Sequence, residues 1–219
     1  MAPKFELPFT QPSHVVAIGC ALLLAIFLST SGYGAWDNTG VWRTVPRMCH
    51  VLAFSMLLGM QFWVSFVAGV VMYTNLPRHT FGYIQSKLFP KYFQISTILI
   101  TIVVGTFVWE HSKWEWKTML QGGMLVTSLL MIVLNLIALQ PKATRVMFEK
   151  HLIEKEEQAG DSIGKVDDEK LKSLMEMKKY RELSSQFIRL HSLSAIANLI
   201  ALCTEVVHLW YLVSNLTTL

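Results

Sequence analysis

Charged residues are scarce in this 219-residue chain, and three long stretches lack them altogether. Asp, Glu, Lys and Arg make up 16% of the residues, whereas hydrophobic residues make up 53%. None of the four charged types occurs within 48–77, 92–109 or 118–141. A helix needs about 20 mainly apolar residues to cross the hydrocarbon core of a bilayer, so these stretches predict three membrane spans. A fourth span is expected in 192–219, which is interrupted only by Glu205, and a soluble domain is therefore excluded.

Motifs of metal sites and nucleotide-binding enzymes are also missing. The chain has neither the HExxH motif of zinc peptidases nor a phosphate-binding P-loop. Its three cysteines, Cys20, Cys49 and Cys203, lack CxxC spacing and so indicate neither a zinc site nor a disulfide framework. The formal net charge of +4 is better explained by the anionic leaflet of a membrane than by nucleic acid. We therefore expect no enzymatic activity, no cofactor, no metal and no nucleic-acid partner.

Polar side chains recur at a spacing of seven residues in two of the predicted spans. Seven residues are nearly two helical turns, so each set lies along one face of its helix. Because an unpartnered polar side chain is costly in hydrocarbon, these faces are predicted to meet other helices or a water-filled cavity. The two sets are Gln121, Ser128 and Asn135, and His191, Asn198 and Glu205. With Gln61 of the first span and His208 of the last, these residues form a candidate intramembrane polar site.

Glu205 and His208 lie three residues apart, deep in the last span, and are close enough to interact on one helix face. As a functional site, the pair would relay a proton or coordinate a cation. As a structural clamp, Glu205 would instead be hydrogen-bonded to Asn135, Gln61 or His208. The sequence leaves both roles open.

The predicted fold is an all-α integral membrane protein with a four-helix transmembrane bundle and an extra N-terminal span. Residues 1–47 form an N-terminal extension with that span at 15–30. The residues before this span are only weakly basic, so we expect a retained helix and not a cleaved signal peptide. The core at 48–219 has spans at about 48–74, 92–109, 118–140 and 192–217. Prolines bracket a short interfacial segment at 77–90, and Pro141 marks a kink or boundary. A helical hairpin is expected at 142–190, with one arm before residue 160 and the other a single helix over 169–190.

Lys and Arg concentrate in the segments 78–91 and 142–189, which would lie on the same side of the membrane. By the positive-inside rule that side is cytosolic. The hairpin and the N-terminus are therefore predicted in the cytosol, and the C-terminus in the lumen or outside the cell. Arg78, His79, Lys87 and Arg189 are candidate contacts for lipid headgroups, although ordinary cytosolic flanking charge is the simpler explanation of them.

The chain resembles the transmembrane protein 205 family of small membrane proteins with four predicted spans. The resemblance extends over about 47–203. It rests on Met60, Gln61, Trp63, Val64, Phe66, Val67 and Gly69 in the first span, on LPRHTFG at 76–82, QSKLFP at 85–90, Tyr92, Phe93, Asn135 and Pro141, and on Phe187, Arg189, His191, Leu193, Ser194 and Asn198. It implies an all-helical membrane domain without an assigned enzymatic activity or cofactor. The N-terminal extension, Glu205 and His208 lie outside the pattern.

Two classes of function remain. The first is a helper or scaffold without enzymatic activity in the endomembrane system or plasma membrane, with membrane lipids as partners and a protein partner held by the hairpin. The alternative is a small transporter or channel with a polar path that includes Glu205 and His208. Because four or five short spans leave little room for two inverted repeats, such a path would require a homo-oligomer.

Overall fold

The computed structural model describes residues 38–111 and 115–215, with the backbone alone for 38–43. The chain divides into two units, 1–43 and 44–219, and the fold presented below is that of the second unit. The expected N-terminal span at 15–30 lies outside the described residues.

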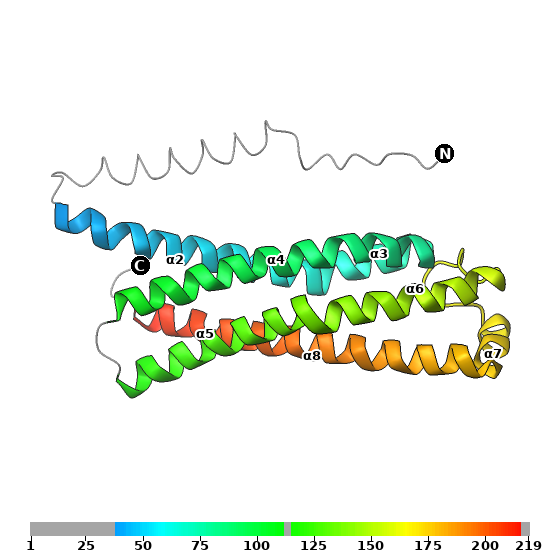
Figure 1. The fold of residues 1–219 in the computed structure, drawn as a ribbon. Helices are drawn as coiled ribbons and strands as arrows, with labels where there is room; N and C mark the ends of the chain where they lie inside the picture. The colour runs from blue at the N-terminus through cyan, green and yellow to red at the C-terminus, as the bar shows by residue number, and fades with distance from the viewer. Residues whose placement is uncertain (1–37, 112–114, 216–219) are drawn as a thin grey trace. The chain divides into compact units, whose positions relative to one another are not determined.

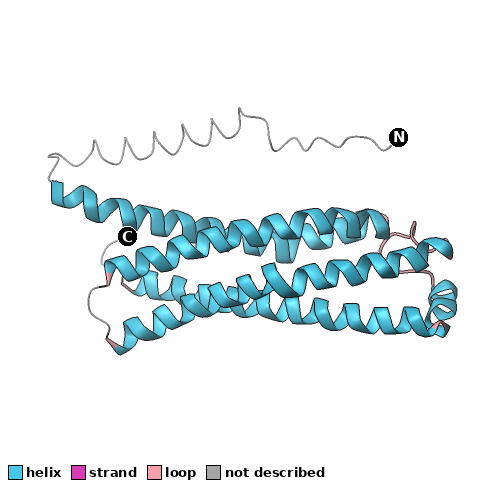
Figure 2. Ribbon diagram, viewed as in Figure 1, coloured by secondary structure: helices cyan, strands magenta, loops and turns pink. Residues whose placement is uncertain are grey.

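The described residues form a bundle of long helices without a named strand (Figures 1 and 2). The elements in chain order are α2 (Asn38–Phe62), η2 (Trp63–Ala68), α3 (Gly69–Asn75), α4 (Arg78–Glu110), α5 (Trp116–Leu134), η3 (Asn135–Leu139), α6 (Gln140–Glu156), α7 (Asp168–Glu176) and α8 (Lys178–Ser214). Four continuous helical stretches are long and apolar enough to cross a membrane: Thr44–Asn75, Arg78–Glu110, Trp116–Glu156 and Lys178–Ser214. The prediction of an all-helical protein with four candidate spans is confirmed.

Two of these stretches contain a π-helical segment, in which each backbone hydrogen bond spans five residues and not the four of an α-helix. The segment η3 ends two residues before Pro141, and the helix then continues as α6 to Glu156. Proline cannot donate a backbone hydrogen bond, and its ring collides with the carbonyl four residues earlier, so a local π-bulge accommodates it without ending the helix. Pro141 is therefore the site of a local distortion and not a helix boundary.

The prediction of a separate interfacial segment at 77–90 is wrong. Pro77 is the N-cap of α4, and the helix runs through Pro90 to Glu110 without interruption. The N-terminal turn of α4 tolerates Pro77 because the first amides of a helix have no intrahelical acceptor in any case.

The prediction of one helix over 169–190 is also wrong, because the backbone is extended at Met177, between α7 and α8. Leu174 and Tyr180 lie on either side of this break and are both buried in one small apolar cluster with Ala159 and Val166. Six residues along a continuous helix rotate by about 240° beyond a full turn, so an unbroken helix would place these two side chains on different faces. The break brings both of them into the same cluster.

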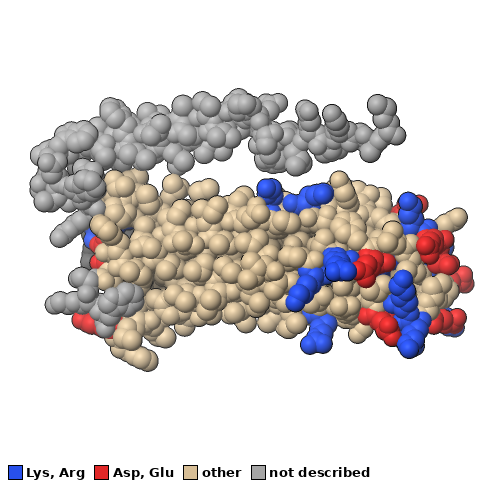
Figure 3. Space-filling view, viewed as in Figure 1, with Lys and Arg blue, Asp and Glu red and all other residues tan. Residues whose placement is uncertain are grey.

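Apolar residues cover both the interior and the surface of the bundle. Leu57, Ile100 and Leu125 belong to the main buried cluster, whereas Ile98 and Leu130 are more than half exposed on the outside. Figure 3 shows an uncharged body and, at the end of the bundle near α7, a concentration of charged side chains. An exposed apolar surface of this extent is typical of a protein in contact with lipid.

We expect Leu57→Ala to destabilise the bundle by about 2 kcal/mol or more, because the fully buried Leu57 side chain would leave a cavity in the packed interior. Thermal unfolding of the purified protein in detergent measures the effect. Leu52→Ala is the matched control on the same helix, since 42% of Leu52 is exposed. Equal unfolding temperatures for the two variants would contradict the interior position of Leu57.

Candidate functional site

Glu205 lies inside the bundle and joins three helices. Its Oε1 atom accepts hydrogen bonds from Gln61 Nε2 on α2 at 2.8 Å and from Ser128 Oγ on α5 at 2.7 Å. All three side chains are fully buried. The structure thus brings together three of the predicted polar residues, and it provides one of the partners expected for a structural clamp.

His208 lies one turn further along α8 and contacts a different pair of residues. Its Nε2 atom is 2.9 Å from His50 Nε2 on α2, so one ring donates and the other accepts, and His50 Nδ1 is 2.8 Å from Thr106 Oγ1 on α4. Within the described residues, no hydrogen bond joins His208 to Glu205. The two residues predicted as a pair therefore belong to adjacent networks, and sequence reasoning did not anticipate His50 as a partner.

The remaining predicted polar residues are distributed along the bundle. Asn198 accepts from Tyr92 OH at 2.8 Å and donates to Ser65 Oγ at 2.9 Å. Asn135 Nδ2 donates to the carbonyl of Ser194 at 3.2 Å, which joins η3 to α8. Two predicted residues lie apart from these bonds: Gln121 is buried, with no partner for its Oε1 atom among the described residues, and His191 stacks on Phe187.

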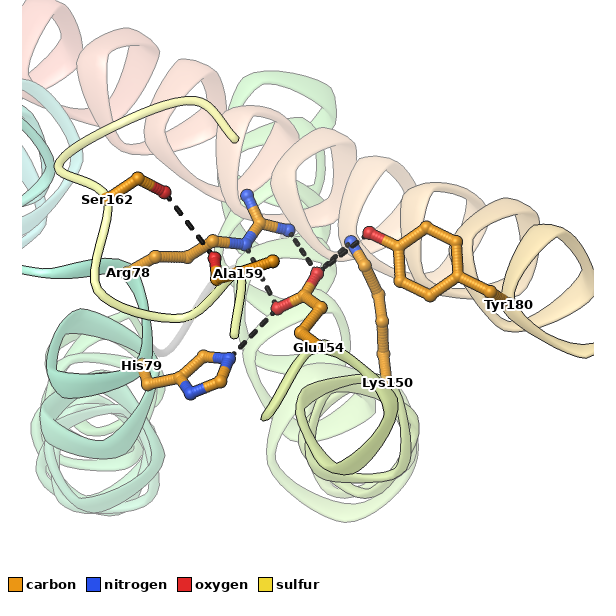
Figure 4. Close-up of polar contacts among 7 residues, drawn as sticks. All are labelled: Arg78, His79, Lys150, Glu154, Ala159, Ser162 and Tyr180. Atoms are coloured by element: carbon orange, nitrogen blue, oxygen red, sulfur yellow. Dashed lines mark hydrogen bonds and ion pairs between the residues drawn. The ribbon is translucent and has the colours of Figure 1, made fainter. Parts of the chain in front are cut away.

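Arg78 and His79 converge on Glu154 at the charged end of the bundle (Figure 4). Arg78 donates through Nε and Nη2 at 3.2 and 3.0 Å, and His79 Nε2 lies 3.1 Å from Oε2 of the same carboxylate. Tyr180 OH donates at 2.8 Å, and Lys150 Nζ lies 3.6 Å away. The Glu154 side chain is fully buried by these groups. We refer to these five residues as the Glu154 cluster.

The loop at 157–167 lies against the first turn of α4. The amide of Arg78 donates to the carbonyl of Ser162 at 3.0 Å, and the amide of His79 donates to that of Gly160 at 3.3 Å. These bonds provide acceptors for helix N-terminal amides that no side chain caps. A Cβ atom at Gly160 would lie 2.2 Å from the His79 ring, so only glycine allows this approach. The sequence analysis did not predict this cluster, because Glu154 lies in a segment with many charged residues. Only its spacing from Lys150 sets it apart from the other acidic residues there.

The two other predicted headgroup contacts are not part of the Glu154 cluster. Lys87 is exposed, with its ammonium 5.5 Å from the centre of the Tyr83 ring, and Arg189 is exposed on α8. Both have the geometry of flanking charges with their heads in solvent or among lipid headgroups.

Ligand atoms of His79, His151 and Glu154 lie within 4.8 Å of one another, which is close enough to surround a metal ion. Both Glu154 oxygens, however, accept hydrogen bonds from Arg78, and Lys150 adds a second positive charge beside them. These cations oppose a divalent ion at the same carboxylate, so we interpret the cluster as an ion-pair network.

Residues 160–164 read GDSIG and so match the GxSxG spacing of hydrolase nucleophile elbows. That motif requires a sharp turn from a strand into a helix, whereas these residues lie in the loop between α6 and α7. The Ser162 hydroxyl donates a hydrogen bond to the carbonyl of Ala159 at 3.5 Å. The spacing alone therefore does not indicate a nucleophile.

A cavity of about 640 Å³ lies among the η2–α3 segment, α4, α6 and α8. Its walls are largely apolar, with Arg78 and Lys150 at one end and Tyr92 and Asn198 at the other. Glu205 does not line this cavity.

We expect Glu154→Gln to destabilise the protein by about 3 kcal/mol, because Arg78 and Lys150 would be left beside a neutral group in a buried site. Glu149→Gln on the same helix removes only an exposed ion pair with Arg145, so it should change stability by less than about 1 kcal/mol. Thermal unfolding of both purified variants measures the difference. A Glu154→Gln variant as stable as Glu149→Gln would contradict the structural importance of the cluster.

The comparisons with known proteins agree with the resemblance read from the sequence. Residues 52–152 match DUF4149, a domain of unknown function. The chain is 36% identical to transmembrane protein 205 of Danio rerio over 177 residues, which are 79% of this chain and 94% of that protein. No solved structure matches the chain. The identity and its coverage show that this chain belongs to the transmembrane protein 205 family.

Proposed function

We propose that this protein is a multi-pass membrane protein without enzymatic activity that acts as a helper or scaffold in the endomembrane system. The observation that carries the proposal is the environment of Glu205. This carboxylate is fully buried, and it holds Gln61 of α2 and Ser128 of α5 against α8. A polar group used in this way stabilises helix packing and leaves the outer surfaces for partners.

The placement of the cavity supports the same proposal. A transport path would need to connect Glu205 and His208 to both membrane faces. The cavity instead ends at Tyr92, Asn198 and Leu202 on the side facing Glu205, and neither Glu205 nor His208 contributes to its lining. The buried polar side chains are hence better explained as links between helices than as steps along a conduit.

In this proposal the end of the bundle that carries the Glu154 cluster lies in the cytosol. Arg78, Lys87 and most of the basic residues of 142–189 belong to this end, as the positive-inside rule requires. The ends of α6 and α8, the loop and α7 form the cytosolic hairpin there. Leu152 and Ile163 are 64% and 57% exposed on it, which suits a protein partner. The C-terminus then lies in the lumen or outside the cell.

A second candidate function is transport of protons or small ions. It is favoured by two buried atoms, Glu205 Oε2 and His208 Nδ1, that have no hydrogen-bond partner among the described residues. Such atoms are uncommon in native interiors and are sometimes found where a proton or ion passes.

A flux measurement separates the two functions. We expect liposomes that contain the protein and a trapped pH-sensitive dye to retain an imposed pH gradient equally well with the wild type and with Glu205→Gln. The variant keeps an oxygen for Gln61 and Ser128 to donate to, so it is the matched control. Dissipation of the gradient several-fold faster by the wild type would overturn the scaffold proposal and support transport.

A labelling experiment tests the orientation. Single cysteines are introduced as Ile163→Cys at the loop and Glu115→Cys at the opposite end of the bundle, in a chain whose native cysteines are replaced by serine. In cells whose plasma membrane is selectively permeabilised, an impermeant maleimide should label residue 163. For an endomembrane protein, residue 115 should react only after all membranes are dissolved. Labelling of residue 115 but not of 163 would reverse the assigned orientation.

A further inference from the structure

The cavity beside the Glu154 cluster has an uneven distribution of polarity. It extends along α4 from Arg78 to Tyr92, which is about 21 Å of helix. Phe66, Val70 and Phe89 contribute to the apolar walls between these ends. A cavity with a charged end and an apolar body matches an amphiphile better than it matches a polar solute.

The charged end carries more positive than negative charge. Glu154 is the single carboxylate of the cluster, whereas Arg78 and Lys150 are two basic residues that line the cavity. Arg78 uses Nε and Nη2 for Glu154, so its Nη1 group remains available to a ligand, and Figure 4 shows this group directed away from the carboxylate. The ring of His151 adds a further nitrogen to the same wall. Guanidinium and ammonium groups in this arrangement favour a phosphate oxygen.

Lys150 is held at this end by its surroundings. Only 6% of the residue is exposed, and its ammonium lies 5.4 and 5.5 Å from the ring centres of Tyr180 and Phe187. A lysine that merely flanks a membrane span would extend into solvent, as Lys87 does. The buried position of Lys150 is explained if the ammonium also serves an anion in the cavity.

We propose that this cavity binds a membrane lipid with an anionic phosphate headgroup, with the headgroup at Arg78 and Lys150 and an acyl chain along the apolar wall toward Leu202. The inference does not depend on the scaffold proposal, because a transporter and a scaffold would both accommodate such a lipid. The apolar outer surface of the bundle places the cavity within reach of membrane lipids, whereas a free phosphate would leave its apolar length unfilled.

Photolabelling of the reconstituted full-length protein tests the proposal. The probe is a phosphatidic acid with a diazirine on one acyl chain, present as a minor component of phosphatidylcholine vesicles. We expect labelled residues within 64–73, 81–93 and 194–202, which line the cavity. Labelling should exceed that by the corresponding diazirine phosphatidylcholine by about tenfold, and inorganic phosphate should not compete.

Two substitutions with matched controls locate the effect. Lys150→Gln should lower labelling by the phosphatidic acid to the level of phosphatidylcholine, whereas Lys142→Gln, on the exposed face of α6, should not. Ala195 lines the cavity and is not buried, so the helix tolerates a larger side chain at this position. Ala195→Phe should fill the cavity and reduce labelling several-fold. Ile196→Phe, on the outer face of the same helix, should not change labelling.

Equal labelling by both lipids, or labelling that persists in Ala195→Phe, would overturn the proposal. Competition by inorganic phosphate would also overturn it and assign the cations to a free anion. If Lys150→Gln does not fold, Lys150→Arg and Ala195→Phe retain the test. The arginine variant should keep the preference for the anionic lipid, and the phenylalanine variant should lose the labelling.

Discussion

A polar side chain inside an apolar bundle needs a partner on another helix, and the packing of the four spans depends on this requirement. Glu205 is the most demanding case, because an acidic residue at the centre of a span costs roughly 2.5 kcal/mol or more on insertion. Its bonds to Gln61 and Ser128 connect α2, α5 and α8 at one level. Apolar packing alone would tolerate several orientations of each helix about its own axis, whereas these hydrogen bonds form in only one orientation. They consequently specify which faces of three helices meet.

A second polar arrangement determines the structure at the charged end. Glu154 is surrounded by donors from α4, α6 and α8, and the loop at 157–167 adds backbone bonds to the start of α4. Here the partners are cations, so removing one of them would leave a buried charge. The cavity lies between this cluster and the polar network inside the bundle. Its mixture of charge and apolar surface follows from that position.

Much of the fold can be predicted because hydrophobicity is a local property. The charge-free stretches at 48–77, 92–109 and 118–141 each overlap one of three of the four observed membrane-length helices, and the family resemblance is confirmed. The errors occur where local signals compete with packing. The sequence predicts that Pro90 ends a segment, but α4 continues through it. Conversely, the helical pattern of 169–190 gives no sign of the break at Met177, which exists because Leu174 and Tyr180 enter one cluster.

The sequence by itself determined the class of the protein, the number of membrane-length helices in its core and the polar residues inside them, since composition and periodicity depend only on neighbours along the chain. Only the tertiary structure decided the pairing of these residues. Gln61 and Glu205 are 144 positions apart, and Arg78 and Glu154 are 76 apart. Helical periodicity places each residue on a face but does not say which face of another helix it meets. That choice depends on side-chain shape and hydrogen bonding across all four helices at once.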